Sequence, residues 1–354
     1  MKKILFFSNS IDISGLSSVL ITYANLLCDT YSVVYVYCSE SIENKKKFDA
    51  RIHSICLNIN RFRRCFIALY KTIKKERPDI IYTGGEFQNL YCIFANWLAG
   101  GNAKVLISQH NYLNIEYNSF IGSTVRNICY KLYNLSDRVI AISRGINDFL
   151  ITNGVNEDKI SIVYNPIDID RIEHMSKEPI QENITNYFVF IGRLSVVKNL
   201  YFLIDSFEKV LEKKYDYHLM IIGDGPEKTN LAEYVNKKGL NTKVLLIGPR
   251  VNPYPYLKKS TSLMLPSLSE AVPSVVLESF VLGKTVVSTP NPGGIDLLKN
   301  GKLGYISKSF NDIEEFSDLM IDSILKPVDP KLLILESRLY SFNIKKSEIL
   351  KDFD

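Results

Sequence analysis

The feature of the sequence that most constrains the fold is an alternation of short apolar runs with helical patterns, which occurs twice. The first series has apolar runs near residues 2–7, 31–38, 78–84, 103–108 and 137–143, and the second near 186–192, 217–223, 242–248, 260–267 and 283–289. Helical patterns separate these runs, for example over residues 17–27 and 201–213. Such alternation is typical of parallel sheets covered by helices, so we expect an α/β chain with two doubly wound, Rossmann-like domains.

The hydrophobic periodicity lapses between residues 165 and 185, a stretch with two prolines and many polar residues. We therefore expect a first domain over residues 1–168, a linker over 169–185, a second domain over 186–328, and a helical tail over 329–354 that packs back toward the first domain. A length of 354 residues suits two domains. Doubly wound domains bind ligands at the carboxyl ends of their strands, so we expect a site in the cleft between the domains.

Composition excludes some classes of protein. The net charge of +5 is too small to indicate a nucleic-acid partner. The apolar start, residues 4–7, is too short for a signal peptide, and the uncharged run over 87–103 is too interrupted for a membrane-spanning helix. The six cysteines show no metal-binding spacing, so we expect reduced thiols that act as small core hydrophobes in a cytoplasmic protein.

Two glutamates flank an apolar run in the segment SEAVPSVVLESF, from Ser269 to Phe280. Pro273 suits the first turn of a helix and disfavours helix before it, so we expect Glu270 in a loop and Glu278 on a mostly buried helix. A buried carboxylate needs hydrogen-bond donors, which a ribose diol could supply, and the free N–H groups at the helix start favour phosphate. The alternative is a solvated Glu270 and a Glu278 paired with a buried arginine.

A basic pair follows the first strand of the second series, where FVFIGRLSVVKNL contains Arg193 and Lys198. Two cations at the carboxyl end of a strand can neutralise a diphosphate, although a lysine at such a turn can also be merely solvated. Gly223 and Gly225 lack the third glycine of a dinucleotide fingerprint, so we interpret IIGDGPEK as a tight strand-to-helix turn. Asp168, in NPIDID, is interpreted as a helix cap.

Taken in order, several segments resemble the retaining nucleotide-sugar glycosyltransferases of family 4, which have the GT-B fold. They are PDIIYTGG and DRVIAIS in the first half, then VYNPIDID, IGRLSVVKN, IIGDGPEK, LLIGPRV and SEAVPSVVLESFVLGKTVVSTPNPGG. The resemblance implies a hexosyltransferase of bacterial surface-polysaccharide or lipid-linked oligosaccharide synthesis. It differs from the family where Gly15 stands without a second glycine and where Ala271 and Val272 follow Glu270.

The resemblance also implies residue roles. The catalytic set would be Glu270, His110, Arg193 and Lys198. Arg193 and Lys198 would bind the donor diphosphate, while Glu270 and His110 would meet the transferred sugar. The remaining donor-binding positions would be Glu278 at the ribose, the backbone of Ser274 and Val275 at the phosphates, Val251 at the base, and Gly15.

The reaction implied is transfer of a hexose or N-acetylhexosamine, with retention, from a nucleotide diphosphate sugar to a polyprenyl-diphosphate-linked glycan. The resemblance favours UDP as the carrier, with GDP as the alternative. The mechanism would be front-face, with fixed cations in place of a metal ion and no cofactor besides the nucleotide sugar. An alternative is a non-catalytic partner subunit or glycan-binding protein of the same fold. A nicotinamide dehydrogenase is disfavoured because the glycine fingerprint is missing.

A basic segment from Arg61 to Arg77 has apolar residues at 62, 66, 69, 70 and 73, which is helical spacing. A basic amphipathic helix can lie on anionic lipid. The family resemblance implies that this surface would be the inner face of a bacterial cell membrane. The alternative is an ordinary helix with its apolar side in the core and its basic side in water.

Overall fold

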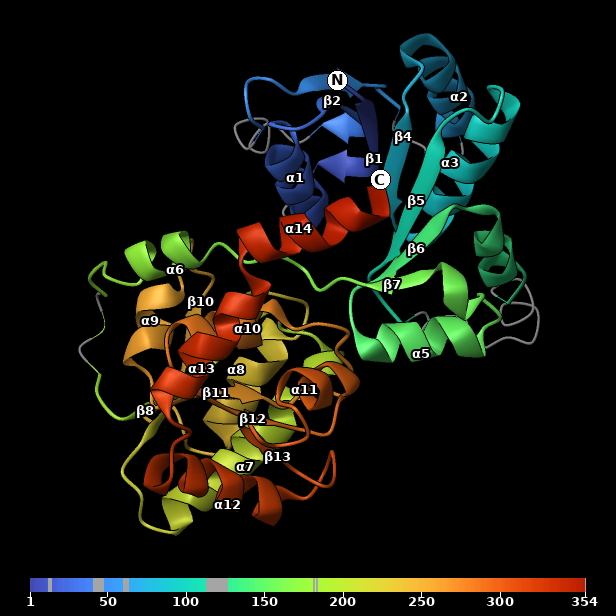
Figure 1. Cartoon of the computed structure of the whole chain (residues 1–354). Helices are drawn as coiled ribbons and strands as arrows, with labels where there is room; N and C mark the ends of the chain where they lie inside the picture. Colours follow the sequence, from blue (N-terminus) through green and yellow to red (C-terminus); the bar gives the residue numbers. More distant parts are fainter. Residues whose placement is uncertain are drawn as a thin grey trace. The chain divides into compact units, whose positions relative to one another are not determined.

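The computed structural model describes residues 1–11, 15–40, 48–59, 64–112, 127–180, 182 and 184–353. The chain divides into two compact units: Met1–Pro166 together with Phe342–Asp354, and Ile167–Ser341. Each unit contains one parallel sheet with helices on its faces (Figure 1). The predicted α/β architecture of two doubly wound domains is confirmed.

The sheet of the first unit has seven strands in the order β3-β2-β1-β4-β5-β6-β7, all parallel to their neighbours. The strands are β1 (Lys3–Ile11), β2 (Ser32–Glu40), β3 (His53–Cys56), β4 (Ile80–Gly84), β5 (Lys104–Gln109), β6 (Arg138–Ala141) and β7 (Ile160–Ile162). The order reverses beside β1, as in doubly wound folds that bind ligands at this point.

The helices of the first unit cover both faces of its sheet. They include α1 (Gly15–Leu27), α2 (Cys65–Glu76), α3 (Glu86–Leu98), α5 (Arg144–Thr152) and α14 (Phe342–Phe353). In Figure 1, α2 and α3 lie side by side on one face, and α1 and α14 lie on the other.

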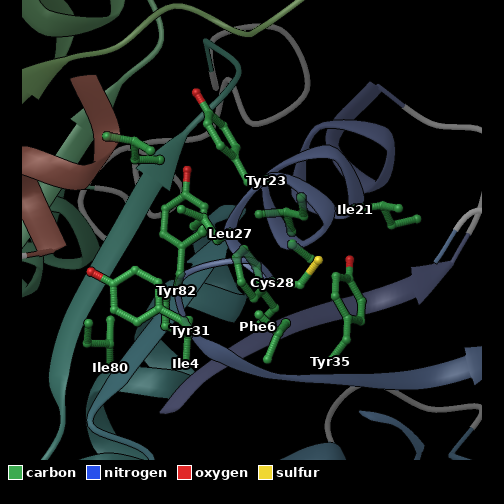
Figure 2. Packing of buried hydrophobic residues seen from close by; sticks show 14 of the residues in the cluster. Ile4, Phe6, Ile21, Tyr23, Leu27, Cys28, Tyr31, Tyr35, Ile80 and Tyr82 are labelled. Carbon is green, nitrogen blue, oxygen red and sulfur yellow. The ribbon is translucent and has the colours of Figure 1, made fainter. Parts of the chain in front are cut away.

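The core beneath α1 is rich in aromatic side chains, as Figure 2 shows. Phe6 stacks on Tyr35 at 5.9 Å between ring centroids and meets Tyr82 edge-on at 5.4 Å. Tyr23, from α1, and Phe353, from α14, both contact the Tyr82 ring edge-on. The last helix of the chain therefore completes the core of the first unit.

The sheet of the second unit has six strands in the order β10-β9-β8-β11-β12-β13, again all parallel. The strands are β8 (Tyr187–Ile191), β9 (His218–Ile222), β10 (Val244–Gly248), β11 (Ser262–Leu265), β12 (Thr285–Ser288) and β13 (Tyr305–Ile306). The helices are α6 (Ile169–Met175), α7 (Leu200–Glu212), α8 (Lys228–Lys237), α9 (Tyr254–Lys259), α10 (Ser274–Val281), α11 (Pro292–Leu297), α12 (Ile313–Leu325) and α13 (Pro330–Ser337).

The segments expected as linker and tail contain regular structure. Helix α6 lies within residues 169–185 and belongs to the second unit. Of the helices in residues 329–354, α13 belongs to the second unit and α14 to the first.

One cysteine pair differs from the expectation of six reduced thiols. The structure records a disulfide between Cys38, on β2, and Cys65, at the start of α2, with Cα atoms 6.5 Å apart. Both side chains are fully buried. The sequence separation of 27 residues gave no motif that would indicate pairing. Cys28, Cys56, Cys92 and Cys129 are free, as expected.

Candidate active site

Four of the predicted site residues of the second unit lie in the connections that follow its strands at one edge of the sheet: Arg193, Lys198, Val251 and Glu270. Strands β8 and β11 are parallel neighbours, so the loops that follow them leave the sheet side by side. The backbone N–H of Leu268 donates to the Val197 carbonyl at 2.8 Å, which joins the two loops directly. Lys198 Nζ lies 2.5 Å from Glu270 Oε1. The structure therefore brings together two residues that are 72 apart in sequence.

Two glycines support the loop that carries Arg193. The Leu194 N–H donates to the Asp224 carbonyl at 2.9 Å, and a Cβ on Gly225 would lie only 2.2 Å from the Leu194 oxygen. Gly223 has φ +152°, which side chains rarely adopt. IIGDGPEK is thus the predicted tight turn, and it packs against the Arg193 loop. Arg193 itself is exposed and forms no ion pair with any residue the structure describes.

A third glycine lies behind Glu270, and the sequence reasoning missed it. The Gly293 N–H donates to the Glu270 carbonyl at 2.9 Å. A Cβ at Gly293 would come 2.8 Å from the oxygen of Ala271 and 2.8 Å from Cδ of Pro273. The segment PNPGG contributed only to the family resemblance, but its paired glycines were a signal of close backbone approach.

The two glutamates lie where the sequence predicted. Helix α10 begins at Ser274 after Pro273, so Glu270 is in the preceding loop and Glu278 is on the helix. No side chain caps α10, and Ser274 is exposed while Val275 is half-buried. The first N–H groups of this helix are therefore suited to an anion.

Glu278 is half-buried and carries a perturbed carboxyl group. Burial raises the pKa of Glu278 to about 7, against the smaller lowering effects of the Ser274 hydroxyl and the Arg171 charge. Within the described part of the chain, no lysine or arginine pairs with it, so the alternative of an arginine-paired Glu278 is not observed. The Ser274 hydroxyl donates to this carboxyl group, whose remaining lone pairs can accept further hydrogen bonds.

Val251 lies in the loop between β10 and α9, and its side chain is fully exposed. Its neighbours are fixed: Arg250 pairs with Glu182 at 2.7 Å, and the Asn252 amide donates to the Met175 carbonyl at 2.8 Å. No pattern in the sequence indicated a role for Glu182, which precedes Arg250 by 68 residues.

Two predicted residues belong to the first unit. His110 directly follows β5 and is buried; its Nε2 lies 2.8 Å from Ser108 Oγ. Burial lowers the pKa of His110 to about 4, so the ring is neutral at pH 7. Gly84 leaves room for the Ser108 hydroxyl and the His110 ring, because a Cβ at residue 84 would lie 2.8 Å from Ser108 Oγ. Gly15 is the first residue of α1, and the loop before it, residues 12–14, lies outside the described residues.

A polar cluster near His110 was not predicted. Tyr130 OH donates to Glu86 Oε1 at 3.2 Å, and Gln109 Nε2 donates to the Asn111 carbonyl at 2.8 Å and to Glu86 Oε1 at 3.3 Å. Gln109 and Tyr130 are both almost fully buried. Polar residues at or just after the ends of β4 and β5 could have indicated this cluster, because neighbouring parallel strands end at a common edge of the sheet.

Helix α2 covers the described part of the basic segment, because residues 61–63 fall outside the described residues. Its apolar side packs in the interior of the protein, since Cys65, Leu69 and Ile73 are buried. The opposite side is exposed and consists of Arg64, Ile67, Lys71, Lys74, Lys75 and, just after the helix, Arg77. This burial is what the ordinary-helix alternative predicted, so any contact with lipid would have to use the basic side.

Among the residues the structure describes, no group of three or more His, Cys, Asp or Glu side chains could hold a metal ion. None of the helices formed by those residues combines the length and apolar character that a membrane span requires.

The chain is similar to known glycosyltransferases along most of its length. A model described as Glycosyltransferase Family 4 matches residues 13–171, and one described as Glycosyl transferases group 1 matches residues 170–338. An uncharacterized glycosyltransferase of Methanocaldococcus jannaschii is 28% identical over 324 residues, covering 81% of this chain and 78% of the relative. The UDP-Gal:alpha-D-GlcNAc-diphosphoundecaprenol alpha-1,3-galactosyltransferase of Escherichia coli is 26% identical over 370 residues, covering 96% and 93%.

A solved structure shows the same fold. HepE from Anabaena, in complex with UDP, superposes with a TM-score of 0.83 at 18% identity and covers 100% of this chain and 99% of that one. With the two matching models spanning residues 13–338, the chain belongs to the family 4-type glycosyltransferases and has their GT-B fold.

Proposed function

We propose that this glycosyltransferase moves a hexose or N-acetylhexosamine from a UDP-sugar to a polyprenyl-diphosphate-linked glycan, with retention of the anomeric configuration and without a metal ion. The name of the E. coli relative specifies UDP-Gal as the donor and a diphosphoundecaprenol-linked sugar as the acceptor. It therefore supports both the donor and the acceptor of the proposed reaction. HepE, solved with UDP, supports the choice of nucleotide.

The observation that carries the proposal is the pairing of Lys198 with Glu270 beside the uncapped start of α10. A cation, a carboxylate and free helix N–H groups at one sheet edge provide complementary groups for a diphosphate and a sugar hydroxyl. Arg193, exposed and without an ion pair among the described residues, is available for the same diphosphate. Glu278, which forms no ion pair with a described lysine or arginine, has lone pairs that suit a ribose diol.

The proposed reaction is a front-face substitution. The bond between the anomeric carbon and the diphosphate oxygen breaks as Arg193, Lys198 and the start of α10 stabilise the negative charge of the leaving group. The acceptor oxygen forms its bond to the anomeric carbon on the same face, and its proton passes to the departing phosphate oxygen. Glu270 contacts the sugar and stabilises the positive charge that develops on it.

His110, from the first unit, is assigned to a hydroxyl group of the transferred sugar. Because burial keeps its pKa at about 4, the ring is neutral and carries one N–H donor and one acceptor nitrogen. A neutral ring can bind a sugar hydroxyl without adding charge to the site, and His110 takes no part in proton transfer.

The acceptor is membrane-bound in this proposal, and the exposed basic side of α2 is assigned to the anionic inner face of a cell membrane. Lys71, Lys74 and Lys75 are all exposed on this side, and each basic group near such a surface contributes about 1 kcal/mol. The proposal therefore requires attachment through charge rather than through insertion of the helix.

The experiment is transfer from a panel of UDP-sugars to a polyprenyl-diphosphate-linked N-acetylglucosamine, with the product anomer assigned by proton NMR. An α-linked donor should give an α-linked product, whereas a β-linked product would contradict retention. Glu270→Gln should lower kcat by at least about 100-fold, since it removes charge at the reacting centre. Glu233→Gln, an exposed glutamate of α8, is the matched control and should leave kcat unchanged.

The same variants decide the alternative of a non-catalytic partner subunit. Such a protein would show no turnover with any donor, and Glu270→Gln would change nothing measurable beyond ligand affinity. A ligand present at 100 times its dissociation constant stabilises a protein by about 2.7 kcal/mol, so a thermal-shift panel identifies the nucleotide sugar in either case.

A further inference from the structure

The loop of residues 249–253, between β10 and α9, is held in place by an ion pair and several side-chain hydrogen bonds. It leaves the sheet through Gly248, which has φ +72°, next to an irregularity in the pairing of β10 with β9. Two of its side chains are anchored to other segments, while Val251 between them is fully exposed. We call this segment the 249–253 loop.

The first anchor is a closed triangle of side chains. Arg250 Nη2 donates to Glu182 Oε1 at 2.7 Å, and Tyr256 OH donates to Glu182 Oε2 at 2.6 Å. Arg250 Nε donates to the Tyr256 hydroxyl at 3.2 Å, which closes the triangle. Arg250 Nη1 also donates to the Ile247 carbonyl at 2.6 Å. The guanidinium group thus joins both ends of the turn to the segment before β8.

Glu182 is ionised in this triangle. Burial alone would raise its pKa, but hydrogen bonds from Tyr256 and Arg250 outweigh this effect and lower the pKa from its ordinary value. A charge-assisted pair that is only partly exposed holds its geometry better than a solvated surface pair does. Tyr256 is held in turn, because Tyr187 OH donates to its carbonyl at 2.7 Å.

The second anchor is Asn252. Its side-chain amide donates to the Met175 carbonyl at the end of α6 at 2.8 Å, and its Oδ1 accepts from the Tyr254 N–H at 3.2 Å. With Arg250 and Asn252 both fixed, the peptide groups on either side of Val251 have one defined position. Among the described residues, no hydrogen bond engages the backbone of Val251.

We propose that Arg250, Glu182 and Tyr256 are positioning residues that hold the 249–253 loop as a platform for the nucleobase of the donor. This inference rests on the proposed function, because it assumes a nucleotide at this edge of the sheet. The 249–253 loop leaves the same carboxyl edge as the loops with Lys198 and Glu270, since β8, β10 and β11 belong to one parallel sheet. An exposed aliphatic side chain on fixed backbone offers a base both a flat apolar contact and peptide hydrogen bonds.

The competing explanation is that the triangle only fastens the segment around Glu182 to the second unit. A fastening role would change stability but would leave the choice between bases untouched. A platform role changes the affinity for the nucleotide and the discrimination between UDP and GDP, because a displaced loop no longer matches one base.

The test is calorimetric titration of UDP and GDP into the full chain and its variants, with kcat and KM measured in parallel. Arg250→Met should weaken UDP binding at least tenfold, reduce the preference for UDP over GDP, and raise KM for the donor more than it lowers kcat. Tyr256→Phe, which removes one hydroxyl, should act in the same direction by about threefold and guards against misfolding of the first variant. Lys243→Met, which removes an exposed ion pair before β10, is the matched control and should bind UDP normally.

Unchanged UDP affinity and unchanged discrimination in Tyr256→Phe and in any folded Arg250→Met would overturn the platform role while leaving the proposed function intact. An unmodified protein that binds neither nucleotide would overturn the proposed function and this inference with it.

Discussion

Replacing Glu278 by glutamine should make the ligand-free protein more stable at alkaline pH. The carboxyl group has a pKa of about 7 in the folded protein, against an ordinary value of 4.5. Since one pKa unit corresponds to about 1.36 kcal/mol, a difference of about 2.5 units between these two values amounts to about 3 kcal/mol. The side-chain amide of the Glu278→Gln variant carries no charge and would avoid this penalty at any pH.

The direction follows from proton binding. The folded state holds the proton of Glu278 more tightly than the unfolded state, so raising the pH from 4.5 to about 7 removes stability, and above this range the penalty is constant. Glu278→Gln should therefore exceed the unmodified protein by less than about 1 kcal/mol at pH 5 and by up to about 3 kcal/mol at pH 8.5.

Urea denaturation at the two pH values measures this difference. Glu233→Gln, at an exposed position of α8, is the control and should show no pH-dependent gain. Equal changes in unfolding free energy for Glu278→Gln at pH 5 and pH 8.5 would refute the reasoning, because they would show that the carboxyl group is not forced to ionise against burial.

The affinity for the donor should rise with pH, whereas the stability of the ligand-free protein should fall. In the proposed function the ionised Glu278 accepts hydrogen bonds from the ribose diol, so the affinity for UDP should increase as the pH rises through about 7. Glu278→Gln should bind UDP more weakly at pH 8.5 and lose this pH dependence. The same substitution thus stabilises the protein and impairs its site, which a purely structural role would not produce.

Three further outcomes are expected. Gly293→Ala places a Cβ 2.9 Å from the Glu270 carbonyl oxygen, so kcat should fall at least about tenfold with a loss of about 1–3 kcal/mol in unfolding free energy; normal kinetics would show that the loop can shift freely. Replacing Lys71, Lys74 and Lys75 together by glutamine should weaken binding to vesicles with anionic lipid on the order of 100-fold, measured by sedimentation, and unchanged binding would exclude the basic side of α2. Transfer should persist in EDTA, and an activity that disappears and returns with magnesium or manganese would refute metal-independent catalysis.

Much of the second unit could be predicted from local patterns. The apolar runs located its first five strands, and Pro273 alone separated a loop glutamate from a helical one. Asp168 caps α6 as expected, because its side chain accepts from the Arg171 N–H. These features depend on neighbours within a few residues, where backbone geometry and capping rules are sufficient.

The remaining features depend on contacts between distant segments. Nothing near Glu182 indicated that it would meet Arg250. The tail was expected to pack toward the first domain, but its residues did not indicate that Phe353 would contact Tyr82. Helix α2 is a further case in which the packing could not be predicted from the sequence pattern. Its amphipathic pattern correctly predicted a helix, but only packing could show that Leu69 and Ile73 are already covered.

The backbone contacts of the candidate site explain why Lys198 and Glu270 lie together. Lys198 and Glu270 contact each other because the backbone bond from Leu268 to Val197 joins the loops that carry them. The bond from the Gly293 N–H to the Glu270 carbonyl holds the second of these loops against α11. Backbone bonds fix the loops without using the charged side chains, which remain available to exchange partners. In the proposed function, a donor diphosphate would compete with Glu270 for Lys198, and a sugar hydroxyl would compete with Lys198 for Glu270. A whole nucleotide sugar would then replace one ion pair with a phosphate contact to Lys198 and a hydroxyl hydrogen bond to Glu270, whereas a free phosphate or a free sugar would leave one member unpaired.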